Sequence, residues 1–218
     1  MQIKGLLFDL DGTLINTSEL IIKTFEATII NSLNRKPSRE EITKSFGLPL
    51  AECLKSFDEE KVPEMLKFYR EYNSKYHDEL IKPFPQVSNV LSLLAASDIK
   101  MAVVTSKKSP MALRGLDIFD LSKYITAIIG CDECHNHKPH PEPMEKGAQA
   151  LGLEPQECLC VGDSPFDIQS GKAAGSLTAA VKWTYCEWSY LLDNSNPDYI
   201  LNTMPDLLSI ISEKNKLQ

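Results

Sequence analysis

The sequence predicts an α/β fold, a doubly wound parallel sheet with a small all-helical domain inserted after its first strand. Three observations support this prediction. Short apolar runs alternate with helical patterns from about residue 83 onward, residues 15–82 show only helical patterns, and 218 residues suffice for one ample domain with an insert. We therefore expect an α/β core made of residues 1–14 and 83–218, and a helical domain at residues 15–82.

The first 82 residues supply one strand and the insert. The apolar run Ile3–Phe8 has the length of a strand that is buried on both faces. Apolar residues then recur at helical spacing over residues 18–33. The pair Ser38 and Glu41 forms a capping-box pattern that opens a second helix, and we expect residues 62–80 to form a long third one.

Residues 83–218 alternate between strand and helix patterns, which is typical of a parallel sheet with crossover helices. We expect strands at residues 101–104, 125–129, 158–161, 177–181 and 199–201. We expect helices at residues 87–96, from 109 onward, and at 142–151, 166–174 and 204–212. Ligands of such sheets bind beyond the carboxyl ends of the strands, so the segments that follow the strands are the candidates for function.

The composition excludes several classes of protein. With 43% hydrophobic and 24% charged residues, the chain has the balance of a soluble globular protein. Its formal net charge of −7 disfavours nucleic acid and anionic membranes as partners. No apolar stretch approaches the roughly 20 residues that span a bilayer, and two acids interrupt the first apolar run. We therefore expect a cytoplasmic protein whose six cysteines are reduced.

Two carboxylates, Asp9 and Asp11, follow the first predicted strand directly, and Gly12 comes next. Residues two apart in an extended chain face the same side, so both carboxylates can point into one crevice. Adjacent carboxylates repel each other, and a divalent cation that prefers oxygen ligands, such as Mg²⁺, would hold them together. A single Asp would be interpreted as a turn or helix cap, whereas the pair favours a metal or catalytic site.

Two segments after later strands carry groups that suit a phosphate. Thr105 and Ser106 offer hydroxyl and backbone N–H groups for a phosphoryl oxygen, although such residues also cap helices. Lys138, in the loop before the predicted helix at 142–151, would be a compact positive charge near the carboxylates. An isolated lysine is more often a solvated surface group, so each segment is weak evidence alone.

A fourth segment completes the pattern. Gly162, Asp163 and Asp167 follow the predicted strand at 158–161, and a helix cap explains one of these acids but not both. The order Asp-x-Asp-Gly-Thr, then Thr, then Lys, then Gly-Asp-x-x-x-Asp resembles the haloacid dehalogenase superfamily of phosphohydrolases over the whole chain. The helical insert looks like the C1 cap of that family.

Within this superfamily the chain is most similar to the phosphoglycolate phosphatase group. The runs at residues 16–21, 77–80 and 183–184 look closest to its inorganic pyrophosphatase branch. The resemblance implies that Asp9 is the nucleophile and becomes an aspartyl-phosphate, and that Asp11 is the general acid/base. It implies that Thr105, with Ser106 beside it, binds the phosphate, and that Lys138 steadies both nucleophile and phosphate.

The resemblance also implies the cofactor. Mg²⁺ would be held by Asp9, the backbone carbonyl of Asp11 and Asp163, with Asp167 either a second ligand or its outer support. Phosphoryl transfer depends mainly on positioning and charge neutralisation, so a metal ion and a lysine beside an attacking carboxylate are physically reasonable. Asp11 argues against the dehalogenase branch, which does not need a second carboxylate here.

The expected activity is Mg²⁺-dependent hydrolysis of a small phosphorylated substrate, with inorganic pyrophosphate slightly favoured over phosphoglycolate. A phosphomutase of the β-phosphoglucomutase type is the alternative. Substrate specificity should lie in cap side chains such as Lys44 and the loop at residues 46–49. Asn16 stands where many relatives carry Asp, so a contact at the cap hinge or with the substrate is expected to differ. The protein is expected to be a monomer or a homodimer.

Two alternatives belong to other classes of protein. Cys131, Cys134 and His135 fit the C-x-x-C-H pattern of covalent haem attachment, and they could also bind Zn²⁺. Covalent haem attachment of this kind belongs to exported proteins, and we expect no export signal in this chain. A core of this size does not need a zinc ion for stability, which argues against structural zinc. A non-enzymatic phospho-acceptor of the receiver-domain type also carries a phosphoryl group on an Asp at a strand end. The helical insert after the first strand is less consistent with that class.

Overall fold

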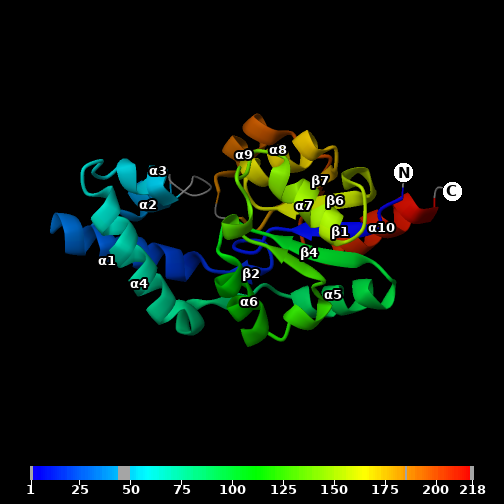
Figure 1. The fold of residues 1–218 in the computed structure, drawn as a ribbon, viewed down its shortest axis with the longest axis horizontal. Coiled ribbons are helices and arrows are strands. Elements are labelled where there is room, and N and C mark those ends of the chain that lie inside the picture. Colours follow the sequence, from blue (N-terminus) through cyan, green and yellow to red (C-terminus); the bar gives the residue numbers. More distant parts are fainter. Residues whose placement is uncertain (1, 44–49, 185, 217–218) are drawn as a thin grey trace.

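In the computed structural model, which describes residues 2–43, 50–184 and 186–216, the chain folds into a sheet domain with a helical insert (Figure 1). The strands are β1 (Gly5–Phe8), β2 (Ile15–Asn16), β3 (Lys82–Pro83), β4 (Lys100–Val104), β5 (Ala127–Ile129), β6 (Cys158–Gly162), β7 (Leu177–Val181) and β8 (Tyr199–Leu201). The α-helices are α1 (Ser18–Leu33), α2 (Arg39–Thr43), α3 (Leu50–Lys55), α4 (Val62–Leu80), α5 (Val87–Ala96), α6 (Ser109–Ile118), α7 (Glu142–Ala150), α8 (Pro165–Ala174), α9 (Trp188–Ser195) and α10 (Asp206–Lys216). Short 3-10 helices are η1 (Ser122–Tyr124), η2 (Cys131–Glu133) and η3 (Pro155–Glu157).

Six of the strands form one parallel sheet in the order β5-β4-β1-β6-β7-β8. The first strand lies in the middle, and Phe8 at its end is in register with Val103 of β4 and with Val161 of β6. The carboxyl ends of these three strands therefore meet at one edge of the sheet, where the strand order reverses. This topology brings together the segments that follow β1, β4 and β6.

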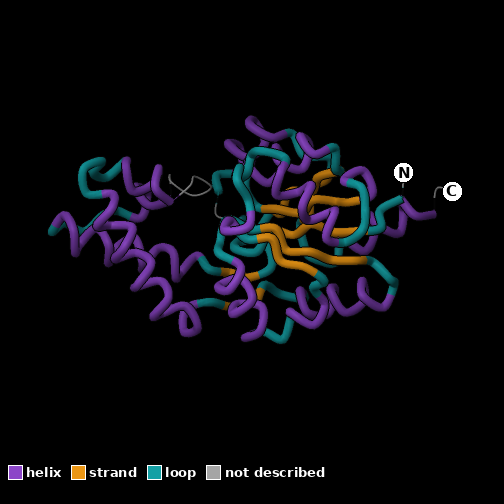
Figure 2. Tube along the Cα trace, in the orientation of Figure 1, coloured by secondary structure: helices purple, strands orange, loops and turns teal. Residues whose placement is uncertain are grey.

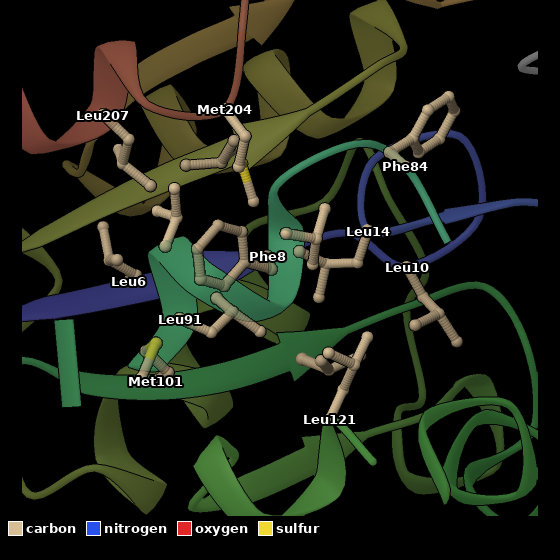
Figure 3. Packing of buried hydrophobic residues seen from close by; sticks show 14 of the residues in the cluster. Leu6, Phe8, Leu10, Leu14, Phe84, Leu91, Met101, Leu121, Met204 and Leu207 are labelled. Atoms are coloured by element: carbon tan, nitrogen blue, oxygen red, sulfur yellow. The ribbon is translucent and has the colours of Figure 1, made fainter. Parts of the chain in front are cut away.

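Helices cover both faces of the sheet, as Figure 2 shows. Alternate residues of β1 point to opposite faces: Leu6 and Phe8 pack with α5, α6 and α10, whereas Leu7 packs with α7 and α8. Figure 3 shows Phe8 among Leu91 and Met204 of the first of these clusters. Burial on both faces explains why the strands are continuous apolar runs, and it makes the sheet a rigid base for the loops at its edge.

Helices α1–α4 form the insert, which has a hydrophobic core of its own and lies to one side of the sheet in Figure 1. In this core Phe25 of α1 packs edge-on against Tyr69 of α4, with ring centroids 5.1 Å apart. Two short segments join the insert to the sheet domain, since β2 pairs antiparallel with β3 and places Ile15 opposite Pro83. We predicted only helices over residues 15–82; the pairing corrects this, because two-residue strands leave no periodic pattern.

The predicted fold class is confirmed, and many boundaries agree with the sequence patterns. Helices α1, α4 and α5 and strands β7 and β8 have the predicted bounds. The predicted capping box is present, because the Ser38 N–H donates to Glu41 Oε2 at 2.7 Å and the Glu41 N–H donates to Ser38 Oγ at 3.1 Å. Helices α3 and α9 were not predicted, and the last helix begins at Asp206 rather than at residue 204.

Lys44 and the loop at residues 46–49, which we expect to carry specificity, lie outside the described residues. Among the described helices, none has both the length and the apolar character needed to cross a membrane.

Candidate active site

Three carboxylates meet at the edge of the sheet where β1 and β6 end. Asp9 follows β1, Asp163 follows β6, and Asp167 lies in the first turn of α8. One carboxylate oxygen of each lies within 4.8 Å of the other two. Asp9 and Asp167 are 7% and 2% exposed, and Asp163 is partly buried. Negative charge is thus concentrated away from water, which is unfavourable unless a cation balances it.

One lysine reaches into this cluster. Lys138 Nζ donates to Asp9 Oδ1 at 2.9 Å, to Asp167 Oδ1 at 2.6 Å and to the carbonyl oxygen of Val104 at 2.6 Å. Burial alone would lower the pKa of Lys138, but the attraction of Asp167 and Asp9 outweighs burial and raises that pKa above 10.5. The lysine is therefore charged, and it joins the ends of β1 and β4 to the start of α8.

One positive charge does not balance the carboxylates. Burial is the largest effect on Asp9, and together with Asp167 and Asp11 it raises the pKa of Asp9 from 3.8 to about 7 despite the attraction of Lys138. Burial, Asp9 and Asp167 also raise the pKa of Asp163 well above its ordinary value. The residues present therefore favour a further cation, and because the donors are oxygens they fit a hard divalent ion such as Mg²⁺.

The competing cysteine and histidine motif does not form a comparable cluster. Within the part of the chain that the structure describes, the three carboxylates are the only group of three or more His, Cys, Asp or Glu side chains that could hold a metal ion. Burial raises the pKa of Cys131 and of Cys134, which disfavours the thiolate form that metals require. Instead, Glu142 at the start of α7 accepts the His135 N–H at 2.8 Å, which orders the loop that leads to Lys138.

Two glycines let the acidic side chains approach the ends of the strands. Gly12 has φ +90°, and a Cβ there would lie 2.2 Å from Asp163 Oδ2. A Cβ on Gly162 would lie 2.3 Å from the Cβ of Asp167. No side chain fits at either position: Gly12 is required by the approach of Asp163 from the second acidic motif, and Gly162 by the approach of Asp167 within its own motif.

The predicted phosphate-binding residues differ in burial. Thr105 follows β4, is 5% exposed, and donates its N–H to the carbonyl oxygen of Ile129 at 2.9 Å. Its hydroxyl accepts the Lys107 N–H at 3.1 Å, which leaves the hydroxyl proton for donation to an anion. Ser106 is exposed. The phosphate-binding roles of Thr105 and Ser106 stay predictions.

The carboxylate of Asp11 lies outside the three-carboxylate cluster. Its Oδ1 accepts a hydrogen bond from Lys107 Nζ at 2.8 Å. Lys107 was not among the predicted site residues, although its place two residues after Thr105 in the same strand-end loop is a signal for such a role. The predicted contribution of Asp11 to metal binding comes from its backbone carbonyl, and it stays a prediction.

Thr184 is a second residue that we had not assigned to the site. It follows β7, and its hydroxyl donates to the carbonyl oxygen of Asp163 at 2.8 Å and lies 3.1 Å from Asp163 Oδ2. This contact lowers the pKa of Asp163, although burial dominates. Its neighbour Trp183 donates its indole N–H to the carbonyl oxygen of Thr13 at 3.3 Å. The loop after β7 thus holds both acidic motifs in place.

Comparisons with known proteins agree with this geometry. Residues 6–181 match the haloacid dehalogenase-like hydrolase family. The chain is similar to pyrophosphatase PpaX of Halalkalibacterium halodurans, with 41% identity over 214 residues that cover 98% of this chain and 99% of that protein. It is also similar to pyrophosphatase PpaX of Bacillus cereus, with 39% identity over 216 residues that cover 99% of this chain and all of that protein.

A solved structure extends the likeness to three dimensions. A haloacid dehalogenase-like family hydrolase from Streptococcus pneumoniae superimposes with a TM-score of 0.87 at 25% identity, and the match covers 95% of this chain and 98% of that one. The match in sequence spans the first strand, the insert and all four motif segments. The chain therefore belongs to the haloacid dehalogenase-like hydrolase family.

Proposed function

We propose that the protein is a Mg²⁺-dependent phosphatase that hydrolyses inorganic pyrophosphate, or another small phosphate compound, through an aspartyl-phosphate on Asp9. The observation that carries the proposal is the charge of the site: three carboxylates gather at the carboxyl edge of a parallel sheet, and Lys138 pairs with two of them, Asp9 and Asp167. Mg²⁺ would supply charge neutralisation when bound, and Asp9, Asp163 and the backbone carbonyl of Asp11 would hold it.

We assign Asp167 to the support of this site rather than to direct metal binding. Its Oδ1 accepts from Lys138, and its Oδ2 accepts from the N–H of Ser164 at 3.0 Å and from the Ser164 hydroxyl at 2.7 Å. Both oxygens are thus engaged by the protein. Asp167 then serves to orient Lys138 toward Asp9.

In the first step, Asp9 attacks phosphorus. Lys138 binds one oxygen of the Asp9 carboxylate, which leaves the second oxygen to form the new O–P bond. The bond from phosphorus to the leaving oxygen breaks, and Asp11 donates a proton to that oxygen. The Thr105 hydroxyl donates a hydrogen bond to a phosphoryl oxygen that does not react.

In the second step, water hydrolyses the aspartyl-phosphate on Asp9. Asp11, now a carboxylate, accepts a proton from the water as its oxygen attacks phosphorus. The O–P bond to Asp9 breaks, so the products are inorganic phosphate and the free Asp9 carboxylate. Asp11 ends protonated, as it began, and Lys138 again pairs with the restored Asp9 charge.

Pyrophosphate is the first substrate to test because two relatives that match nearly the whole chain carry the name pyrophosphatase. Phosphoglycolate is the second, and a sugar phosphate that is isomerised rather than hydrolysed would indicate a phosphomutase. We also propose that residues 15–82 act as a cap domain and that the rest of the chain is the catalytic core. The partner is then a small phosphorylated molecule.

A phosphate-release screen with and without Mg²⁺ tests the proposed function. Pyrophosphate, phosphoglycolate and sugar phosphates are compared at equal concentration, and pyrophosphate is expected to give the highest kcat/KM, with activity lost in EDTA. Isomerisation of a sugar phosphate with little release of phosphate would favour the phosphomutase. Absence of turnover together with uptake of one phosphoryl group would favour a non-enzymatic phospho-acceptor.

Two variants separate the roles of the first two acids. Asp9→Asn should abolish both turnover and labelling by phosphate, because an amide is a poor nucleophile. Asp11→Asn keeps the attacking carboxylate but loses proton transfer, which is worth roughly 10²–10⁴-fold. With a good leaving group, this variant should accumulate a phosphoenzyme, seen as one added phosphoryl group on the peptide that holds Asp9. If no adduct forms while the wild type turns over, water attacks the substrate directly.

A further inference from the structure

Lys107 connects Asp11 to the helical insert. It lies between β4 and α6, and its ammonium group is 2.8 Å from Asp11 Oδ1 and 3.5 Å from Nε2 of His77. His77 belongs to the last turn of α4, on the other side of the junction between insert and sheet domain. The side chain of Lys107 is 15% exposed, so both contacts form in a largely enclosed position.

The imidazole of His77 can only accept a hydrogen bond from Lys107. The ring is fully buried, and its Nδ1 lies 3.0 Å from Asp78 Oδ1. An ionised carboxylate accepts but cannot donate, so Nδ1 carries the proton and Nε2 presents its lone pair to the ammonium group. Burial, with the positive charge of Lys107, lowers the pKa of His77, which is therefore neutral at pH 7.

The position of His77 is itself fixed against the sheet domain. Asp78 Oδ2 accepts from Arg114 Nη2 of α6 at 2.9 Å. Next to Arg114, Gly115 lies directly against the imidazole, since a Cβ there would be in van der Waals contact with Cε1 of His77 at 3.5 Å. The end of α4 is thus seated on α6, and it presents Nε2 to Lys107 from a defined direction.

The contacts of Lys107 can hold the Asp11 carboxylate in one orientation, which the carboxylate cluster does not do. Its side chain is 25% exposed, and it lies outside the carboxylate cluster that Lys138 holds. A general acid must stay within hydrogen-bond reach of the leaving oxygen, and a carboxylate free to change rotamer would leave that position. A lysine side chain is flexible as well, so it can orient Asp11 only if a second group holds the ammonium.

We propose that Lys107 is a positioning residue for Asp11, and that His77 acts on catalysis only by holding Lys107. The junction between insert and sheet domain thereby sets the orientation of the acid/base group. The proposal rests on the proposed roles of Asp9 and Asp11, but it does not depend on which phosphate is the natural substrate.

Aryl phosphates provide the test, because kcat/KM for them reports phosphoryl transfer up to the first irreversible step. 4-Nitrophenyl phosphate has a leaving group that needs little protonation, whereas phenyl phosphate has one that needs more. Lys107→Met should lower kcat/KM for phenyl phosphate by roughly 10²-fold, the cost of a misplaced catalytic group, and that for 4-nitrophenyl phosphate by clearly less. A merely structural loss would lower both equally. Lys108→Met, which removes the same charge from the exposed neighbour, is the matched control and should leave both values near those of the wild type.

Double-mutant cycles then assign the path of the effect. In the Asp11→Asn background, Lys107→Met should cause little further loss; a full additional loss would mean that Lys107 contacts the substrate itself, and it would overturn the proposal. In the Lys107→Met background, His77→Leu should likewise add little. His77→Gln, whose amide oxygen can reach the place of Nε2, should retain more of the wild-type ratio of the two substrates than His77→Leu.

The two proposals fail in different ways. If the wild type hydrolyses neither the aryl phosphates nor any substrate of the phosphate-release screen in the presence of Mg²⁺, the proposed phosphatase function fails and the positioning role falls with it. If the wild type hydrolyses both and the effects of Lys107→Met and Asp11→Asn multiply independently, only the positioning role is refuted. Circular dichroism and thermal unfolding of each variant show that a loss of rate does not reflect a loss of fold.

Discussion

The buried carboxyl of Asp9 should make the metal-free protein less stable as the pH rises. Its pKa is raised from 3.8 to about 7, chiefly by burial, so between these values the folded protein binds more protons than the unfolded chain. Stability then falls with rising pH across this window, and it levels off above about pH 7. One pKa unit corresponds to about 1.4 kcal/mol, so the free energy of unfolding should lose about 3 kcal/mol between pH 5 and 8 through this group.

Other groups titrate in the same range, so the measurement is a difference between two proteins. Urea unfolding in EDTA at pH 5, 6, 7 and 8 is compared for the wild type and for Asp9→Asn, which keeps the shape of the side chain without its charge. Burial lowers the pKa of His77 below 6.5, so the unfolded chain binds more protons at this residue and stability rises as the pH approaches 6.5. This contribution is the same in both proteins and cancels when their stabilities are subtracted.

The stability of Asp9→Asn relative to the wild type should therefore increase with pH. The asparagine variant also relieves Asp163, whose pKa Asp9 helps to raise, and this adds to the effect in the same direction. Mg²⁺ in place of EDTA should stabilise the wild type most at pH 8, because the cation binds the ionised carboxylates. A difference that stays constant from pH 5 to 8 would show that Lys138 outweighs burial and keeps Asp9 ionised throughout.

Three further changes test other parts of the structure. Asp163→Asn should raise the Mg²⁺ concentration that half-saturates phosphatase activity, because it removes a proposed anionic ligand; an unchanged Mg²⁺ dependence would show that Asp163 does not bind the metal. Changing Cys131 and Cys134 together to Ser should leave activity largely intact, whereas loss of a stoichiometric bound metal along with activity would contradict the assignment of that loop. Ser32→Ala should raise the free energy of unfolding by about 1 kcal/mol in urea titrations, since the Ser32 hydroxyl is buried without a partner among the described residues and Ala favours the helix. A destabilised Ser32→Ala protein would mean that the hydroxyl has a partner such as water.

The fold class and most of the helices and strands could be predicted from local sequence patterns. Helices α1, α4 and α5 carry their apolar periodicity in local sequence, and strands β7 and β8 are short apolar runs, so their bounds could be predicted. The capping box of Ser38 and Glu41 is likewise a local signal. The short elements β2, β3 and α3 escaped prediction because two to six residues contain too little of a period to recognise.

The sequence also indicated which acids gather. Asp9 and Asp163 each follow a buried strand, and a parallel sheet places such positions at one edge. That prediction required only the strand pattern and the chain order. The family resemblance then supplied roles for these residues, which the experiments above test.

The remaining contacts of the site join residues that are distant in sequence, and they could be seen only in the folded structure. Lys107 contacts Asp11 and His77, which are 96 and 30 residues away in sequence, and Thr184 contacts Asp163 from the loop after another strand. The structure also showed that Cys131 and Cys134, despite their metal-binding spacing, belong to no metal-ligating cluster among the described residues. Spacing along the chain encodes periods, caps and turns, because those depend on neighbouring residues. Contacts between distant side chains depend instead on strand order and on how the insert sits against the sheet, since these are fixed by burial of the whole core and leave no local pattern.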